Sequence, residues 1–383
     1  MIYDIAIIGA GASALMLASN LSKKKYKNIC LIDTSLKLAP KVKVSGGAKC
    51  NITNEFVTYK NYLGDEEFVK GLLKKFSKDE LLAFLNKNGV YPKINPKIVK
   101  GTYFCNSSQD VIDMFTKLTT HVKKYLGTTV LDVDFDEVYK IKTDSKTIEA
   151  KKLVIASGGL SYPVLGASSI GFDIAKKFGH SIIKLEPALV GFTVQKEQFW
   201  FKNLAGISTN VITSVEGKHF EGSLLFAHKG CSGPVILTTS LYWKKGKIVI
   251  DFLPKKRLES FLVGNKNISS ALPLPKRFIQ EFLNSIELED KATSKLTTLE
   301  LEKLKLLKNY EFSPAGNFGY TKAEVTKGGI NTDEINHQTF ESLKQKNLYF
   351  IGECLNITGE LGGFNFQIAF SEAYVCSQQL NSN

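Results

Sequence analysis

Residues 3–14 read YDIAIIGAGASA, and this stretch decides the fold that we expect. The isoleucine-rich run predicts a buried strand, and the glycines that follow it predict a tight turn. Leu15, Ala18 and Leu21 then recur at helical spacing. A strand, a glycine turn and a helix in this order are typical of the βαβ unit that binds dinucleotides, in the variant whose third glycine is an alanine.

The residue types of this turn each have a physical reason. Gly9 permits the tight turn, Gly11 lets a pyrophosphate approach the backbone, and the small Ala14 lets the helix pack against the strand. A second strand over residues 28–32 ends at Asp33, which can accept hydrogen bonds from both hydroxyls of a ribose. The alternative is a chance glycine turn in another parallel sheet. The dinucleotide-binding positions predicted here are Gly9, Gly11, Ala12, Ser13, Ala14 and Asp33.

Length and composition describe a soluble protein of more than one domain. The chain has 383 residues, of which 43% are hydrophobic and 23% charged. This length favours two or three domains. No apolar run is long enough to span a bilayer, and the N-terminus lacks the regions of a signal peptide. The 6 cysteines form no C-x-x-C pair, so we expect a cytoplasmic protein without structural zinc or a dithiol redox centre. The oligomeric state stays open.

The net charge of +13 comes from lysine, because arginine occurs only at Arg257 and Arg277. Such a charge could attract RNA or an acidic membrane surface. Lysine at nearly every polar position is also typical of a solvated surface, and no compact basic run alternates with aromatic residues. We therefore expect neither a nucleic-acid partner nor a membrane, and we expect a small-molecule substrate.

A second glycine-rich segment, residues 41–54, follows the second strand. Adjacent glycines beside serine, threonine and asparagine expose backbone donors, which suits a loop along the phosphates and ring of a cofactor. An irregular surface turn is the alternative. A buried strand over 153–156 leads into a third such segment at the edge of the sheet where ligands bind. The contacts predicted in these segments are Lys41, Ser45, Gly46, Gly47, Cys50, Asn51, Ser157, Gly158 and Gly159, to which we add Val130.

The C-terminal part indicates which cofactor binds. An apolar strand over 348–351 ends in Gly352-Glu353, and Gly362-Gly363 opens a helix that runs to about residue 379. The acid can bind a ribityl hydroxyl, and the helix N-terminus can stabilise the negative charge of a reduced flavin. A capped strand and a glycine-led packing helix are the alternative. The pattern favours FAD over a bare nicotinamide, with contacts at Gly352, Glu353, Gly362, Gly363, Phe364 and Asn365.

The remaining patterns predict an α/β fold in which a Rossmann-like FAD-binding domain contains an insertion. Residues 1–190 and 326–383 would form the FAD-binding domain, and residues 191–325 the inserted domain. Within the insertion we expect a β-barrel over about 191–253 and 309–325, and a helical module over about 254–308. The local predictions are helices at 65–88, 109–125 and 172–178, a β-meander at 129–133, 138–142 and 147–150, and a turn at Gly328-Gly329.

Four motifs carry a family resemblance: SGGAKCNITN at 45–54, SGGLSYP at 157–163, FAHKGCSGP at 226–234, and GE at 352–353 with GGFNFQ at 362–367. Through them the chain resembles the FAD-dependent oxidoreductases known as aminoacetone oxidases or NAD(P)/FAD-dependent oxidoreductases, a family with a bile-acid dehydro-reductase branch. The resemblance covers essentially the whole chain. It implies a FAD fold with an inserted barrel and a small helical module. The family's usual arginine before the cysteine is Lys49 here, which keeps the charge without the planar fork.

The flavin would perform the hydride step, so few side chains are candidates for catalysis. His228 and Tyr162 are the candidate proton donors, although a structural histidine and a packed tyrosine are the alternatives. Cys50 and Cys354 have no partner cysteine nearby in sequence, and packing explains them better. We expect a flavin oxidoreductase that acts on a small molecule. The alternatives are a flavin-dependent RNA-modifying enzyme and a FAD-binding protein without turnover.

Only one dinucleotide fingerprint is present, and FAD would occupy it permanently. NADH or NADPH would then dock transiently as reductant, which predicts ping-pong kinetics. A shared pocket lined by Tyr162, His228 and Gly328-Gly329 is expected. An amine or carbonyl substrate that reduces the flavin, with oxygen as the acceptor, stays the alternative.

Overall fold

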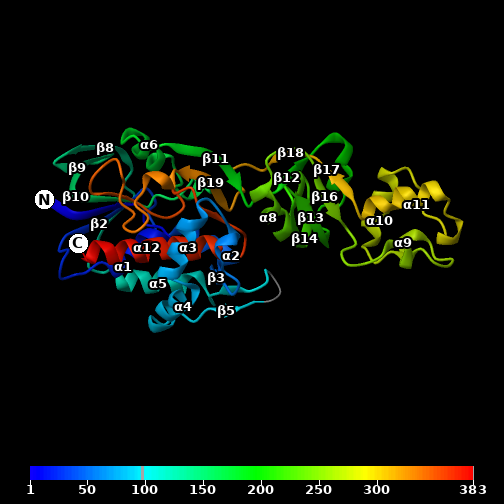
Figure 1. The fold of residues 1–383 in the computed structure, drawn as a ribbon, viewed down its shortest axis with the longest axis horizontal. Helices are drawn as coiled ribbons and strands as arrows, with labels where there is room; N and C mark the ends of the chain where they lie inside the picture. Colours follow the sequence, from blue (N-terminus) through cyan, green and yellow to red (C-terminus); the bar gives the residue numbers. More distant parts are fainter. Residues whose placement is uncertain (96–98, 383) are drawn as a thin grey trace. The chain divides into compact units, whose positions relative to one another are not determined.

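The computed structural model describes residues 1–95 and 99–382 and divides into two compact units (Figure 1). The first unit comprises Met1–Pro187 and Val325–Asn383, and the second comprises Ala188–Glu324. Each unit is described by itself below.

The first unit is built on a parallel sheet with strand order β7 (Lys123–Leu126), β2 (Ile29–Asp33), β1 (Ile2–Ile8), β10 (Thr147–Ile155) and β20 (Leu348–Phe350). Ile8 of β1 pairs with Ile32 on one side and with Ile155 on the other. The carboxyl ends of the central strands therefore meet at one edge, which is where doubly wound folds bind ligands. Strands β9 (Val138–Thr143) and β8 (Val130–Asp136) extend the sheet in antiparallel fashion.

Helices and short ribbons complete the first unit. α12 packs along α1 and α3 (Figure 1). The helices are α1 (Ala12–Asn20), α2 (Pro40–Ala48), α3 (Glu66–Lys75), α4 (Lys78–Lys87), α5 (Ser108–Leu118), α6 (Ile170–Lys177) and α12 (Phe364–Ser382). The remaining strands are β3 (Asn51–Asn54), β4 (Tyr62–Leu63), β5 (Lys93–Ile94), β6 (Thr102–Phe104), β11 (Ile182–Ala188), β19 (Val325–Ile330) and β21 (Thr358–Gly359).

The second unit contains a seven-stranded antiparallel sheet that curls into a nearly closed barrel. The rings of Phe192 and Phe312, on strands far apart in the sheet order, lie 6.1 Å apart. The order is β17 (Tyr310–Phe312), β16 (Ile248–Asp251), β13 (Ser208–Val215), β14 (Lys218–Ala227), β15 (Gly230–Ser232), β12 (Phe192–Val194) and β18 (Pro314–Asn317). The helices are α7 (Trp200–Asn203), α8 (Pro234–Tyr242), α9 (Ile268–Ala271), α10 (Lys276–Ser285) and α11 (Thr298–Leu304).

Several local predictions are corrected by the structure. The helix expected at 65–88 is two helices, because Ser77 caps α4 in a capping box with Glu80. The helix expected at 109–125 ends at Leu118, and 123–126 form the edge strand β7. The strands expected at 147–150 and 153–156 are one strand, β10, whose first half pairs with β9 and whose second half pairs with β20.

Two further corrections concern the insertion and its end. Gly328-Gly329 is not a turn but lies inside β19, where a side chain at Gly328 would collide with the carbonyl oxygen of Lys184. A buried helix, α8, interrupts the run of strands, and it begins at Pro234 because proline is favoured in the first turn of a helix. None of the helices within residues 1–95 and 99–382 is long and apolar enough to cross a membrane.

Candidate FAD-binding site

The glycine turn after β1 lies at the edge where the parallel strands end. Gly9 has φ = +112°, and its N–H donates to the carbonyl oxygen of Ile32 at 2.8 Å. A side chain at Gly9 would collide with the carbonyl oxygen of Ala156, at the end of β10. Only glycine combines this backbone angle with such a close approach. The first turn is therefore locked between β2 and β10.

The N-terminus of α1 is open to an anion. Gly11 is its N-cap, and no side chain of the described residues caps the helix. A Cβ atom placed on Gly11 would meet no described atom within 4 Å. The first turn of the helix, from Ala12 to Ala14, holds no acidic residue. Its uncapped N–H groups and the positive end of the helix dipole suit a pyrophosphate.

Asp33 is oriented by the backbone around it. Its carboxylate accepts hydrogen bonds from the N–H of Ala10 at 2.6 Å and from the N–H of Ser35 at 2.7 Å. Burial raises the pKa of Asp33, and the two backbone donors oppose that rise. The N–H of Thr128 donates to the carbonyl of Asp33, and Val130 follows as the buried first residue of β8. Asp33 and Val130 therefore lie on neighbouring segments, as a nucleotide pocket requires.

The segment from Ser45 to Asn51 leaves the helical conformation within α2. Gly46 and Gly47 have φ of 56° and 64°, and the loop then enters β3 at Asn51. Asn51 Oδ1 and Ser157 Oγ are buried and have no hydrogen-bond partner among the described residues. A buried polar atom without a partner costs on the order of 1–3 kcal/mol. These two atoms are therefore suited to accept or donate a hydrogen bond to a bound group.

Glu353 joins three segments that are distant in the sequence. Lys41 Nζ donates to Glu353 Oε2 at 2.6 Å, and the N–H of Thr326 donates to Oε1 at 2.9 Å. The hydroxyl of Thr326 accepts from the N–H of Leu160 at 2.8 Å, and a Cβ atom on Gly159 would lie 2.7 Å from Glu353 Oε1. The structure thus brings Lys41, Gly159 and Glu353 together. Thr326 was missed because nothing in its local sequence marks it.

The start of α12 is fastened to β3. Gly363 has φ = +97°, and a side chain there would collide with the carbonyl oxygen of Thr53. Thr53 Oγ1 donates to Gln367 Oε1 at 2.5 Å. Asn365 donates its amide to the carbonyl of Gly359 at 2.9 Å and accepts from the N–H of the same residue at 2.8 Å. The first turn of α12 therefore lies beside the strand that follows the Ser45–Asn51 segment.

Glu372 is a residue of this region that sequence reasoning missed. Its side chain is 1% exposed, and it accepts a hydrogen bond from the N–H of Gly352. Burial raises the pKa of Glu372 to about 8, against the effect of that hydrogen bond. A Cβ atom on Gly352 would collide with Ser13 Oγ, so Gly352 packs directly against the first turn of α1. The Glu372 carboxyl group accepts from the N–H of this glycine and therefore stabilises the junction of β20 and α1. A glutamate on the otherwise apolar face of α12, between Ala369 and Cys376, was the signal available in the sequence.

The candidate catalytic residues are divided between the units. Tyr162 is half-buried at φ = +63°, in the first unit and just after the Ser157–Gly159 segment. His228 is exposed in the turn between β14 and β15 of the second unit. Cys50 is buried, and burial raises the pKa of its thiol to about 12. Burial likewise raises the pKa of Cys354. Both cysteines are therefore poor nucleophiles at neutral pH.

This arrangement fits FAD. The α1 N-terminus and Asp33 would hold the pyrophosphate and a ribose, the Ser45–Asn51 segment and Ser157 would contact the rest of the cofactor, and the start of α12 would face the flavin ring. Within the described part of the chain, no three His, Cys, Asp or Glu side chains are grouped as possible metal ligands.

Comparisons with known proteins support the fold and FAD as the cofactor. A family model described as HI0933-like protein Rossmann domain matches residues 3–379. "Ribosomal RNA dihydrouridine synthase" of Escherichia coli (strain K12) is 37% identical, with 99% of this chain and 98% of that protein covered. "3-dehydro-bile acid delta(4,6)-reductase" of Clostridium scindens is 27% identical, with 98% of each chain covered. These names differ from the aminoacetone oxidase that the resemblance implied.

A solved structure shows the fold alone. "Mycobacterium smegmatis Sdh1 complex in the apo form" aligns with a TM-score of 0.50 at 13% identity, covering 99% of this chain and 68% of that chain. The glycine turn, the open helix N-terminus and the family match over nearly the whole chain lead to one conclusion. The chain belongs to the HI0933-like family of FAD-binding Rossmann proteins, and it is a flavoprotein of the oxidoreductase class.

Proposed function

We propose that this protein is an FAD-dependent reductase that converts a uridine of ribosomal RNA into dihydrouridine. The observation that carries the proposal is the 37% identity, over almost the full length of both chains, to a protein named for that activity. A second relative with the same name, from Haemophilus influenzae, is 34% identical over 98% of each chain. The net charge of +13 suits a polyanionic substrate.

This proposal reverses the preference drawn from composition. The sequence favoured a small molecule and argued against a nucleic-acid partner, because lysine is spread evenly and no basic run alternates with aromatic residues. The similarity to two proteins named "Ribosomal RNA dihydrouridine synthase" does not support that expectation. The flavin-dependent RNA-modifying enzyme, kept as an alternative, becomes the favoured function.

The reaction adds a hydride and a proton across the C5=C6 bond of the uracil ring. When bound in its reduced form, FAD supplies the hydride. The chain must supply the proton and exclude water, and Tyr162 and His228 are the proposed donors because each carries a hydroxyl or ring N–H that can transfer a proton. The single dinucleotide fingerprint leaves no resident site for a nicotinamide. NADH or NADPH would therefore bind transiently, before the RNA, in ping-pong order.

A small-molecule reductase is the second candidate, and the relative from Clostridium scindens favours it. A 3-dehydro bile acid with a Δ4,6 system carries alkenes conjugated to a carbonyl, as the uracil C5=C6 bond is conjugated to C4=O. Hydride addition to such a carbon is the same class of chemistry in both cases. The two candidates therefore differ in how substrate is recognised and not in the flavin step.

The test uses ribosomal RNA from an Escherichia coli strain that lacks the relative described above. Purified holoprotein with NADH or NADPH is mixed with this RNA, and dihydrouridine is quantified by mass spectrometry of the digested nucleosides. We expect dihydrouridine to appear only with protein, FAD and reductant together. A Gly11→Val variant, which should fold without FAD, serves as the control and should form none.

A parallel arm replaces the RNA with a 3-oxo-Δ4,6 bile acid. Reduction of the bile acid with no dihydrouridine in the RNA arm would reject the RNA proposal in favour of the small-molecule reductase. Failure of both arms while the flavin is still reduced by nicotinamide would reject both substrate classes.

A further inference from the structure

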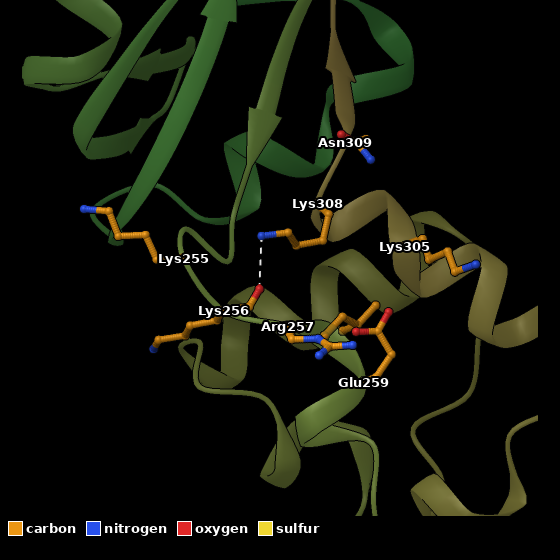
Figure 2. Close-up of a pocket in the computed structure, with 8 residues that line it drawn as sticks. Lys255, Lys256, Arg257, Glu259, Lys305, Lys308 and Asn309 are labelled. Atoms are coloured by element: carbon orange, nitrogen blue, oxygen red, sulfur yellow. Dashed lines mark hydrogen bonds between the residues drawn. The ribbon is translucent and has the colours of Figure 1, made fainter.

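The second unit contains a cationic pocket that the FAD site does not use. Figure 2 shows this pocket of about 440 Å³, which forms where the chain leaves β16 and where it returns from the helical segment toward β17. The lining comes from two segments about fifty residues apart. The lining residues are Lys255, Lys256, Arg257, Leu258, Glu259, Lys305, Lys308 and Asn309.

Lys308 is a structural cation. Its ammonium group donates to Asp251 Oδ2 at 2.7 Å, to the carbonyl of Leu253 at 2.7 Å and to the carbonyl of Lys256 at 3.1 Å. An ammonium group has three donors, so this residue has none left for a ligand. These bonds fasten residues 251–256 to the end of the helical segment.

An aromatic cluster supports the same junction. The rings of Phe252 and Phe278 lie 4.8 Å apart, and Phe278 also contacts Phe226 at 5.8 Å. All three side chains are at most 1% exposed. Phe252 directly follows β16 and lies three residues before Lys255, so the cations of the pocket follow a buried, packed segment.

Two cations of the pocket are available to a ligand. Lys256 and Arg257 are exposed, and neither forms an ion pair with any residue in 1–95 or 99–382. Figure 2 shows the Lys255 and Lys256 ammonium groups on one side of the pocket, with Arg257 between them and Lys305. Arg257 is one of only two arginines in a chain with 50 basic residues. Arginine offers a planar fork that matches two oxygens of one phosphate.

The outer lysines can be recruited as well. Lys255 pairs with Glu221 and Lys305 with Glu302, each at 2.6 Å, but these lysines are 73% and 54% exposed. Surface pairs of this kind contribute about 0–1 kcal/mol, so an approaching phosphate can replace the carboxylate. Glu259 is the single acidic side chain of the lining, so the lining as a whole stays positively charged.

We infer that this pocket binds the phosphate backbone of RNA, with Lys256 and Arg257 as the direct contacts and Lys255 and Lys305 at its rim. The inference rests on the proposed function, which supplies the polyanion. Six of the eight lining residues are lysine, arginine or asparagine, and their charged or amide ends suit phosphate oxygens. Contacts of this kind position the RNA without reading its sequence. It therefore sets affinity, and the flavin site sets which base is reduced.

The test is a double variant, Lys256→Gln with Arg257→Gln, in the holoprotein. Its matched control is Lys244→Gln with Lys245→Gln, two adjacent exposed lysines that precede β16 where the tested pair follows it. The probe is an unmodified, fluorescently labelled ribosomal RNA transcript, titrated at several salt concentrations. Each phosphate contact contributes about 0.7–0.9 to the slope of log affinity against log salt. We expect the tested variant to lose about 1.4–1.8 of that slope and to bind about tenfold more weakly at moderate salt.

The readouts separate this inference from the proposed function. The variant should keep nicotinamide-driven flavin reduction, and the control should bind RNA as the unmodified protein does. Equal RNA affinity for the variant and the control, with dihydrouridine still formed by both, would overturn the pocket and leave the function intact. An unmodified protein that neither binds RNA nor forms dihydrouridine would overturn both. Binding of inorganic phosphate that the double variant loses, with RNA affinity equal in the variant and the unmodified protein, would overturn the RNA assignment.

Discussion

Replacing Glu372 by glutamine tests whether a buried carboxyl group makes the FAD-binding unit less stable as the pH rises. The side chain is 1% exposed and contacts the N–H of Gly352, at the junction of β20 and α1. Burial raises its pKa from 4.5 to about 8, so the folded protein holds a proton that the unfolded chain releases. Glutamine has nearly the same shape and carries no charge at any pH.

The sign and size follow from this difference. Because the folded-state pKa of Glu372 lies above the unfolded one, its protonation contributes to the free energy of unfolding. This contribution is fully present below pH 4.5 and is lost as the pH rises to about 8. The linkage relation gives a loss of about 2.5 kcal/mol between pH 5 and pH 7. Tyr62, Cys354 and Cys376 lie near this carboxyl group, and burial raises their pKa values as well. These three groups stay neutral between pH 5 and pH 7, so they do not contribute to the pH dependence of stability that we assign to Glu372.

The assay must report on the first unit. Both tryptophans, Trp200 and Trp243, lie in the second unit, so their fluorescence is the wrong probe. Amide hydrogen exchange of α12 peptides, corrected for the intrinsic rate at each pH, gives the free energy of opening where Glu372 lies. The unmodified protein should lose about 2.5 kcal/mol from pH 5 to pH 7 relative to Glu372→Gln.

A glutamate on an exposed position gives the matched control. Glu66 lies in the first turn of α3 and is exposed, so Glu66→Gln should follow the profile of the unmodified protein. Parallel profiles for Glu372→Gln and the unmodified protein between pH 5 and pH 7 would refute the reasoning. The carboxyl group would then be ionised in the folded state despite its burial.

Three further predictions concern the FAD site, and a fourth concerns the cysteines. Gly11→Val should leave the free energy of unfolding of the apoprotein unchanged, because φ is −84° and the space beside it is open, but should abolish FAD retention measured by absorbance. Gly9→Ala should instead destabilise the protein itself by roughly 2 kcal/mol or more in urea unfolding, because φ is +112°. Lys41→Gln should weaken FAD binding about tenfold, or about 1.4 kcal/mol, while Lys43→Gln, which loses only a bond to a neutral amide, should not. All six thiols, including Cys50, should resist a thiol reagent in the folded protein and react after denaturation; rapid labelling of the native protein would contradict their burial.

The sequence was informative wherever a local constraint decided the structure. The strand, turn and helix of residues 2–20 were predictable from the spacing of the glycines. Gly9 is required for the tight turn and Gly11 for the close approach of a pyrophosphate, and both requirements are local. The inserted barrel was predictable because short alternating strands follow one another over 192–252. The capping box at Ser77 and the proline at 234 were also local signals, and both were overlooked in favour of longer periodic patterns.

Other features needed the tertiary structure. β10 continues as a single strand although its pairing partner changes halfway, from β9 to β20. No residue within β10 marks this change in the sequence. Thr326 contributes to the site only because β19 returns beside Glu353. Glu372 looks like one polar residue on a helix until its burial against Gly352 is known. The contacts that matter here join residues dozens to hundreds of positions apart.

Different parts of the chain would bind the cofactor and the substrate, so one FAD-binding framework can serve different substrates. The groups that would hold FAD are largely backbone N–H groups, glycines and a few carboxylates, which recognise phosphate, ribose and flavin and carry no information about the substrate. Relatives named for ribosomal RNA and for a bile acid share this chain's length, so their difference must lie in side chains outside the glycine turns. We propose that the pocket with Lys256 and Arg257 is one such place, because its cations lie in the second unit and none of them belongs to the predicted FAD contacts. A bile-acid reductase has no polyphosphate backbone to bind. We therefore expect substitutions at this pocket to change RNA affinity and leave flavin reduction intact, whereas substitutions at Lys41 should reduce FAD binding for any substrate.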